Sequence, residues 1–182
     1  MSKKDKKETY QKLIYILAIF AIGAIVGYLY EVIFYCFTEH IISNRGVLYG
    51  PWLPIYGTGA VLIYFLKPLK KHPIILFILM MLVTGILEYL IGLYCLKVNN
   101  IKLWDYTGLF LNIQGLVCLR SVISFAIGGI ILLYLIEPYL DKKINKIDIH
   151  KLSVASFIFL SIFLTDILLS TIYRTPITYW KK

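Results

Sequence analysis

The chain consists of long apolar segments separated by short polar ones. A transmembrane helix needs about 20 predominantly apolar residues, and the second of the segments, with about 15, is short for one. Whole segments run apolar, whereas a soluble domain alternates apolar and polar positions. The pattern predicts an all-α polytopic membrane protein, a single integral membrane domain over residues 1–182 with about five transmembrane helices. The predicted spans are Leu13–Phe37, Trp52–Leu66, Ile74–Cys95, Gly115–Ile136 and Val154–Arg174.

The charges give these spans a predicted orientation. The net charge of the 182 residues is +9, which could suggest a nucleic-acid partner. The basic residues instead flank the apolar spans, as the positive-inside rule describes. With the N-terminus inside, the inner segments carry 12 Lys and Arg and the outer segments carry 6. We therefore expect the N-terminus inside, the C-terminus outside, the lipid bilayer as the surrounding partner and no nucleic acid.

Four of the five spans contain an ionisable residue. A charge in hydrocarbon costs a few kcal/mol or more, so it usually has a partner or a use. The helical rise from the middle of each span places all four in the outer half of the membrane. Each of the four also shares one helix face with polar or small residues four positions away. For example, Gly23 and Gly27 lie on the same face as Glu31. Transmembrane helices pack closely through such faces. The four are Glu31, Glu88, Arg120 and Asp166.

Two interpretations of these charges stay open at this point. In the first, Arg120 forms a buried ion pair with Glu31 or Glu88 that fixes the helix register. In the second, the charges line a polar cavity that is open to the outside. Three acids against one Arg leave two negative charges over, so either some acids are protonated because they are buried or the cavity attracts a cation.

The first outer loop is apolar and aromatic, unlike a solvated loop. Its Gly and Pro residues argue against a regular helix through 50–54. Irregular backbone at membrane depth is tolerated only against protein or a water-lined cavity, although a tight interfacial turn anchored by Trp52 and Tyr56 is the alternative. The candidate ligand-binding residues of this loop are Asn44, Arg45 and Tyr56, and the candidate structural residues are Gly46, Gly50, Pro51, Pro54 and Gly57.

The second outer loop contributes three further candidate ligand-binding residues: Trp104, Asp105 and Asn112. Asp105 stands beside two aromatic residues, so it could face Arg45 of the first loop and close a lid. Alternatively, Asp105 caps a turn. The three cysteines lie on three different spans without metal-ligand spacing, and no metal or cofactor is expected; they are Cys36, Cys95 and Cys118.

A family resemblance rests on the two loops. The first reads Asn44-Arg45-Gly46-x-Leu48-x-Gly50-Pro51-x-x-Pro54-Ile55-Tyr56-Gly57, and the second contains Trp104-Asp105-Tyr106 followed by Asn112, Gly115 and Cys118. This pattern resembles a family of small bacterial membrane proteins known as putative ABC-transporter type IV, or CmpB-like putative ABC transporter permeases. The resemblance covers residues 15–140 and leaves 141–182, an inner basic segment and the last span, outside. The family tends to have an Arg after the glycine that matches Gly115, where this chain has Leu116.

The resemblance implies a permease in the bacterial plasma membrane. The chain has no GxxxxGK[ST] phosphate-binding loop, so a separate cytoplasmic ATPase would supply the energy. Five spans are few for a complete permease, so we expect a homo-oligomer or a heteromeric membrane partner. The expected function is a transport component that takes a small solute from the outer face. The alternative is a non-transporting sensor, assembly subunit or other membrane partner, in which the buried charges are structural.

An enzyme is not expected. The sequence contains neither HExxH nor GxSxG, and its three histidines all lie outside the predicted spans. In the transport interpretation, Glu31, Glu88 and Arg120 bind the solute and the loops at 44–57 and 104–115 gate the site.

Overall fold

The computed structural model describes residues 3–40, 44–144 and 146–173, and within them the chain is helical with no β-strand. This confirms the predicted all-α fold class. Two short non-α elements occur: a 3-10 helix, η1, and a π-helical turn, η2, which joins α4 to α5. The elements are α1 (Lys3–Glu39), α2 (Pro54–Phe65), η1 (Lys67–Lys71), α3 (Pro73–Val98), α4 (Leu119–Ile131), η2 (Leu132–Ile136), α5 (Glu137–Ile144) and α6 (Ile149–Tyr173).

Four helical segments of the described chain are long and apolar enough to cross a membrane: Glu8–Thr38, Pro73–Val98, Leu119–Lys143 and Ile149–Tyr173. They agree with four of the five predicted spans, although Arg174 at the end of the last one lies outside the described residues. The second predicted span corresponds to α2, a shorter apolar helix of 12 residues. At 1.5 Å per residue α2 is about 18 Å long, less than the ~30 Å hydrocarbon core. Which side faces the cell interior stays a prediction.

Two predicted helix starts were wrong. The second helix begins at Pro54 rather than Trp52, because Leu53 is extended and proline fits the first helical position. The fourth begins at Leu119 rather than Gly115. Gly115 has φ +69°, and Cys118 is extended at φ −147°, so the chain cannot become helical before Cys118. The absence of a regular helix through 50–54 is confirmed, since only Pro54 is helical there.

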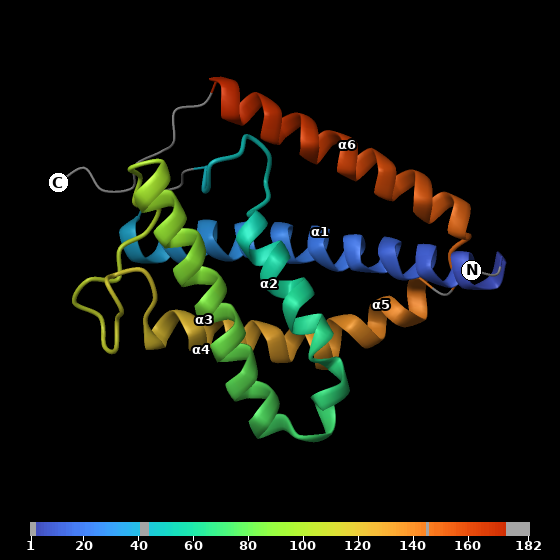
Figure 1. The fold of residues 1–182 in the computed structure, drawn as a ribbon, viewed down its shortest axis with the longest axis horizontal. Helices are drawn as coiled ribbons and strands as arrows, with labels where there is room; N and C mark the ends of the chain where they lie inside the picture. The colour runs from blue at the N-terminus through green and yellow to red at the C-terminus, as the bar shows by residue number, and fades with distance from the viewer. Residues whose placement is uncertain (1–2, 41–43, 145, 174–182) are drawn as a thin grey trace.

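Close packing of α1 against α2 depends on glycines of the predicted small-residue stripe. A Cβ atom built on Gly23 would lie 2.5 Å from the Cβ of Ala60, and one on Gly27 would lie 2.1 Å from the Tyr56 ring. Figure 1 shows α2 running obliquely from α1 toward α4 and α5, α3 crossing α1 in this view, and α6 lying above α1. The buried core at this crossing comprises Ile19, Ala60, Ile63, Leu76, Met80, Ala126, Leu132 and Leu133.

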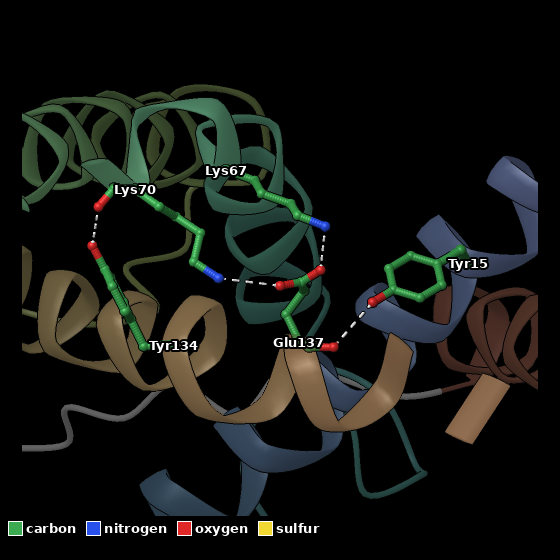
Figure 2. A network of polar contacts seen from close by, with 5 residues as sticks. All are labelled: Tyr15, Lys67, Lys70, Tyr134 and Glu137. Atoms are coloured by element: carbon green, nitrogen blue, oxygen red, sulfur yellow. Dashed lines mark hydrogen bonds and ion pairs between the residues drawn. The ribbon is translucent and has the colours of Figure 1, made fainter. Parts of the chain in front are cut away.

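The two ends of the bundle differ in chemistry. We call the end that carries residues 44–53 and 99–118 the loop end, and the end that carries η1 and α5 the lysine end. At the lysine end the Glu137 side chain is 2% exposed and accepts hydrogen bonds from Lys67 and from Lys70, the latter at 3.4 Å. Figure 2 shows both lysines reaching Glu137 from η1, while Tyr15 of α1 donates to the Glu137 carbonyl at 3.3 Å.

This cluster was not anticipated from the sequence, because Glu137 lies just after the predicted end of its span. The Tyr134 hydroxyl adds a hydrogen bond to the Lys70 carbonyl at 2.6 Å (Figure 2). The hydrogen bond from Lys67 to Glu137 raises the pKa of the Lys67 ammonium group. The cluster therefore joins η1 to the junction of α4 and α5 and to α1.

Candidate functional site

A cavity of about 370 Å³ lies between α1, α2 and α4. Its lining extends along α1 from Ile22 to Tyr35 and along α4 and η2 from Arg120 to Ile136, and α2 forms its floor with Tyr56, Ala60 and Ile63. The stretch on α1 corresponds to about 20 Å of helix. The volume falls in the range of roughly 300–1,000 Å³ that is typical of small-molecule sites.

The cavity opens on the side of the bundle, between α1 and α4. On α1 the lining residue Val26 is 49% exposed, and on α4 the lining residue Ile127 is 51% exposed. Residues of a closed cavity would be buried, so these two mark its opening. A molecule can therefore enter between the two helices without passing through the loop end.

The loop end of the cavity contains a partly buried ion pair. The Arg45 Nε atom lies 3.2 Å from Glu31 Oε2, and the Tyr56 hydroxyl donates to Glu31 Oε1 at 3.2 Å. The Arg45 guanidinium lies 3.4 Å from the centroid of the Tyr35 ring and the residue is 5% exposed. Glu31 thus pairs with an arginine of the first loop, and the interpretation in which it pairs with Arg120 was wrong.

Glu88 lies behind the cavity wall rather than in the cavity. It is 2% exposed, and it accepts hydrogen bonds from the Tyr106 hydroxyl at 2.8 Å and from the Ser121 hydroxyl at 2.6 Å. Tyr106 and Ser121 themselves line the cavity. Burial, together with Glu88, raises the pKa of Tyr106, so its hydroxyl keeps the proton that it donates. Because two hydroxyls bind Glu88, the alternative in which Glu88 pairs with Arg120 was wrong as well.

Arg120 is exposed and lines the cavity at the loop end. Its guanidinium lies 5.6 Å from the centroid of the Phe34 ring on the opposite wall. Glu31, Glu137 and Asp105 form ion pairs with other basic residues, and no carboxylate of the described residues pairs with Arg120. The polar end of the cavity therefore contains the Glu31–Arg45 ion pair and Arg120, and the Glu88 carboxylate lies behind Tyr106 and Ser121.

Asp166 of α6 is separate from this cavity. Its carboxylate accepts hydrogen bonds from the amides of Tyr49 at 3.0 Å and Gly50 at 2.9 Å, and from Trp52 Nε1 at 2.7 Å. Ser170 donates a fourth bond at 3.0 Å. These contacts fix the first loop against α6, so Asp166 satisfies backbone donors rather than lining a shared polar site.

The other candidates of the first loop shape its backbone. Asn44 is exposed and its side-chain amide donates to the Tyr49 carbonyl at 3.3 Å. Gly46 has φ +79°, a conformation that favours glycine. Pro51 is exposed and Pro54 begins α2. A Cβ on Gly50 or Gly57 would come within 3 Å of the Trp52 ring or of Phe20, respectively.

The candidates of the second loop hold turns. Trp104 Nε1 donates to the Leu116 carbonyl at 2.7 Å. Asp105 Oδ1 accepts from the amide of Thr107 at 2.8 Å, and Lys102 lies 2.8 Å from Asp105 Oδ2. The hydrogen bonds from Lys102 and Thr107 lower the Asp105 pKa to about 2. The turn interpretation of Asp105 is confirmed, and the alternative in which Asp105 faces Arg45 was wrong.

Asn112 has the same role as Asp105. Its side-chain oxygen accepts from the Gly115 amide at 3.1 Å, and its side-chain nitrogen donates to the Leu109 carbonyl at 2.8 Å. Of the nine candidate ligand-binding residues, Glu31, Tyr56 and Arg120 line the cavity. Arg45 and Glu88 contact side chains that line it, and binding by any of the nine stays a prediction.

Two side chains at the cavity were missed in the sequence: Tyr106 and Ser121. Tyr106 follows Trp104-Asp105 in the loop motif, so its place in that motif was the available signal. Ser121 accepts a hydrogen bond from the Cys118 amide at 3.2 Å at the start of α4. A serine at this position of a helix is explained by that capping contact alone, so the sequence did not indicate its second contact, with Glu88. Among the described residues the three cysteines are free thiols and no metal-binding cluster of His, Cys, Asp or Glu occurs.

The four long apolar helices of the described residues define the class as a multi-pass membrane protein. The chain belongs to the family described as putative ABC-transporter type IV, whose model matches residues 18–171. The match includes most of α6, so the expectation that the last span lies outside the family region was wrong. No curated protein and no solved structure matches the chain.

Proposed function

We propose that this chain is the membrane-embedded component of a transporter that takes a small ligand into the cavity between α1, α2 and α4. The observation that carries the proposal is that Arg120 and Glu31 line the same open, mostly apolar cavity, where Glu31 pairs with Arg45 and Arg120 has no ion pair with a carboxylate of the described residues. Membership of a family described as an ABC-transporter type supports it. The chain acts as one membrane domain over residues 1–182.

In this proposal the loop end faces outward and the lysine end faces the cytoplasm of a bacterial cell, in accordance with the distribution of Lys and Arg. The ligand enters from the outer half of the membrane and contacts Arg120 and the Glu31 carboxylate. Tyr106 separates the ligand from Glu88, so Glu88 sets the position of the wall rather than touching the ligand. The chain performs no covalent chemistry of its own, and a cytoplasmic ATPase and a second membrane subunit complete the transporter.

The test compares cells that lack the chain with cells that carry the wild type or a variant. Untargeted mass spectrometry of the medium and of cell extracts identifies the compounds whose uptake depends on the wild type. We expect Glu31→Gln, Glu88→Gln and Arg120→Ala to reduce uptake of the same compounds, while Lys71→Gln, an exposed lysine of η1, leaves it unchanged. Folded variants with unchanged uptake would contradict the proposal.

A second candidate is a non-transporting membrane partner in which the buried charges are structural. It is favoured by the contacts of Glu31 and Asp166, because Arg45, Tyr56 and the amides of the first loop already satisfy their carboxylates. Purification of the tagged chain in mild detergent separates the two functions. An ATPase with a GxxxxGK[ST] loop in the complex supports the transporter, and a stoichiometric partner without an ATPase supports the second candidate.

A further inference from the structure

The cavity between α1, α2 and α4 is amphipathic along its length. At the loop end it is lined by Glu31, Tyr106, Arg120 and Ser121, and away from that end its walls are aliphatic, ending at Ile136. A ligand that fills such a cavity needs a charged or polar group at one end and a hydrocarbon portion over the rest. A compact polar solute would leave the apolar part of the walls without a contact.

The dimensions of the cavity suit a hydrocarbon chain. From Arg120 to Ile136 the wall follows about 24 Å of helix, whereas half of the ~30 Å hydrocarbon core is about 15 Å. Arg120 is the second residue of α4 and of the apolar segment Leu119–Lys143, so we expect its guanidinium near the end of the span, close to the lipid headgroups. A chain of one leaflet can therefore extend along the wall while its headgroup stays at Arg120.

The charges at the loop end select the headgroup. Arg45 neutralises Glu31 at 3.2 Å, while no carboxylate of the described residues pairs with Arg120. Of the two charged side chains that line the cavity, the one without an ion-pair partner among the described residues is therefore positive, and the Glu88 carboxylate is separated from the cavity by the hydroxyls of Tyr106 and Ser121. A guanidinium presents several donors in one plane and matches the oxygens of a phosphate or carboxylate, so an acidic headgroup complements this end of the cavity.

We propose that the cavity binds a membrane lipid with an acidic headgroup, which lies on Arg120 while an acyl chain extends between α1 and α4. The lipid enters through the lateral opening at Val26 and Ile127. This proposal rests on the proposed function, because it names the ligand class of the same cavity. A transmembrane helix with its side chains is about 10–12 Å wide, too wide to enter a cavity of about 370 Å³.

Gly128 offers a way to fill the cavity without disturbing the protein. It lines the cavity, and a Cβ atom built on it would meet no atom within 4 Å. Its neighbour Gly129 differs, because a Cβ there would lie 2.8 Å from the Met80 sulfur. A leucine at position 128 therefore extends into the space proposed for the acyl chain, whereas position 129 is needed for packing.

The experiment measures lipid binding to the purified full-length chain by native mass spectrometry. The probes are dioleoyl phosphatidylglycerol and dioleoyl phosphatidylcholine, which share their acyl chains and differ in headgroup charge. We expect the wild type to bind phosphatidylglycerol at least about tenfold more tightly than phosphatidylcholine. Arg120→Gln should abolish that preference, and Gly128→Leu should weaken the binding of both lipids.

Two matched controls should bind both lipids as the wild type does. Lys71→Gln removes one positive charge at the lysine end, and Ala155→Leu adds a leucine on an exposed face of α6. Equal affinity of the wild type for both lipids overturns the proposal. So does a preference that survives Arg120→Gln, or a Gly128→Leu variant that binds both lipids as tightly as the wild type does. So does a Gly128→Leu variant that dissociates a dimer and still binds lipid normally, since the groove would then be an interface between copies.

The same variants distinguish this proposal from the function on which it rests. If lipid binding is insensitive to Arg120→Gln while uptake in cells still depends on Arg120, the ligand class is wrong and the transporter function stands. If lipid binding responds as expected but no compound depends on the chain for uptake and no ATPase copurifies, the lipid site stands and the transporter function is wrong.

Discussion

The packing of α1 against α2 predicts opposite effects for the same substitution at two glycines. A Cβ atom at Gly27 would lie 2.1 Å from Cγ of the Tyr56 ring, whereas carbon atoms pack about 3.5–4.0 Å apart. Relief requires a shift of roughly 1.5 Å or more. The Tyr56 ring cannot turn away freely, because it stacks on Phe125 with centroids 4.9 Å apart and donates a hydrogen bond to Glu31.

Gly27→Ala therefore combines an overpacking cost of about 3 kcal/mol with a helix-propensity gain of about 1 kcal/mol, a net loss near 2 kcal/mol. Gly128→Ala has the same propensity gain and no clash, so it should be neutral or stabilising by up to about 1 kcal/mol. For a chain of this size 1 kcal/mol corresponds to a Tm change of about 2–4 °C. The Tm of Gly27→Ala should thus fall by about 4–8 °C.

The assay is thermal unfolding of both variants and the wild type in one detergent, followed by intrinsic fluorescence. The comparison between the two glycines cancels effects of detergent and of alanine itself. A Gly27→Ala variant that unfolds at or above the Tm of Gly128→Ala would refute the close approach of α1 and α2 at this position.

Three further predictions concern the charged clusters. Asp166→Ala removes the carboxylate that accepts three hydrogen bonds from the first loop, at about 1–3 kcal/mol each. Hydrogen exchange at the Tyr49 and Gly50 amides should therefore accelerate roughly 100-fold or more, and slow exchange there would contradict the contacts. Glu137→Ala should lower the free energy of unfolding by about 1–2 kcal/mol, because the two lysines lose their acceptor. The loss stays modest since both lysines are partly exposed to solvent. A Tm equal to that of the wild type in thermal unfolding would contradict the cluster. Because its pKa is lowered to about 2, Asp105 should stabilise its turn above pH 4 and lose this effect as the pH falls toward 2, which NMR of the Thr107 amide can follow.

The class of fold could be predicted from the sequence because hydrophobic length is a local property. Each long apolar helix was evident from its own residues, and the Gly23–Gly27 stripe identified a packing face. The start of α4 could not be predicted, because the residues around Gly115 are as apolar as the helix that follows. What delays the helix is backbone conformation, the positive φ of Gln114 and Gly115 and the extended Cys118, which composition does not reveal.

The partners of the buried charges could not be predicted for a different reason. Depth along a helix follows from residue number, so the charges were expected to lie together. Depth says nothing of the direction around the bundle, and Asp166 lies on a helix that faces the first loop instead of the cavity. The arginine that pairs with Glu31 is Arg45 of that same loop, 14 residues further along the chain. The loop motif predicted only that Arg45 binds a ligand or belongs to a gate, and it gave no sign of a pairing with Glu31.

The bonds between Asp166 and the first loop also determine the order in which the protein can be completed. The amide of Tyr49 is separated from its acceptor by 117 residues. At a synthesis rate of about 5–20 residues per second, the ribosome needs roughly 6–20 s to supply that acceptor. During this interval the loop has left the ribosome while its donors at Tyr49, Gly50 and Trp52 still lack the carboxylate. The first loop therefore reaches its final form only after α6 has been made and inserted.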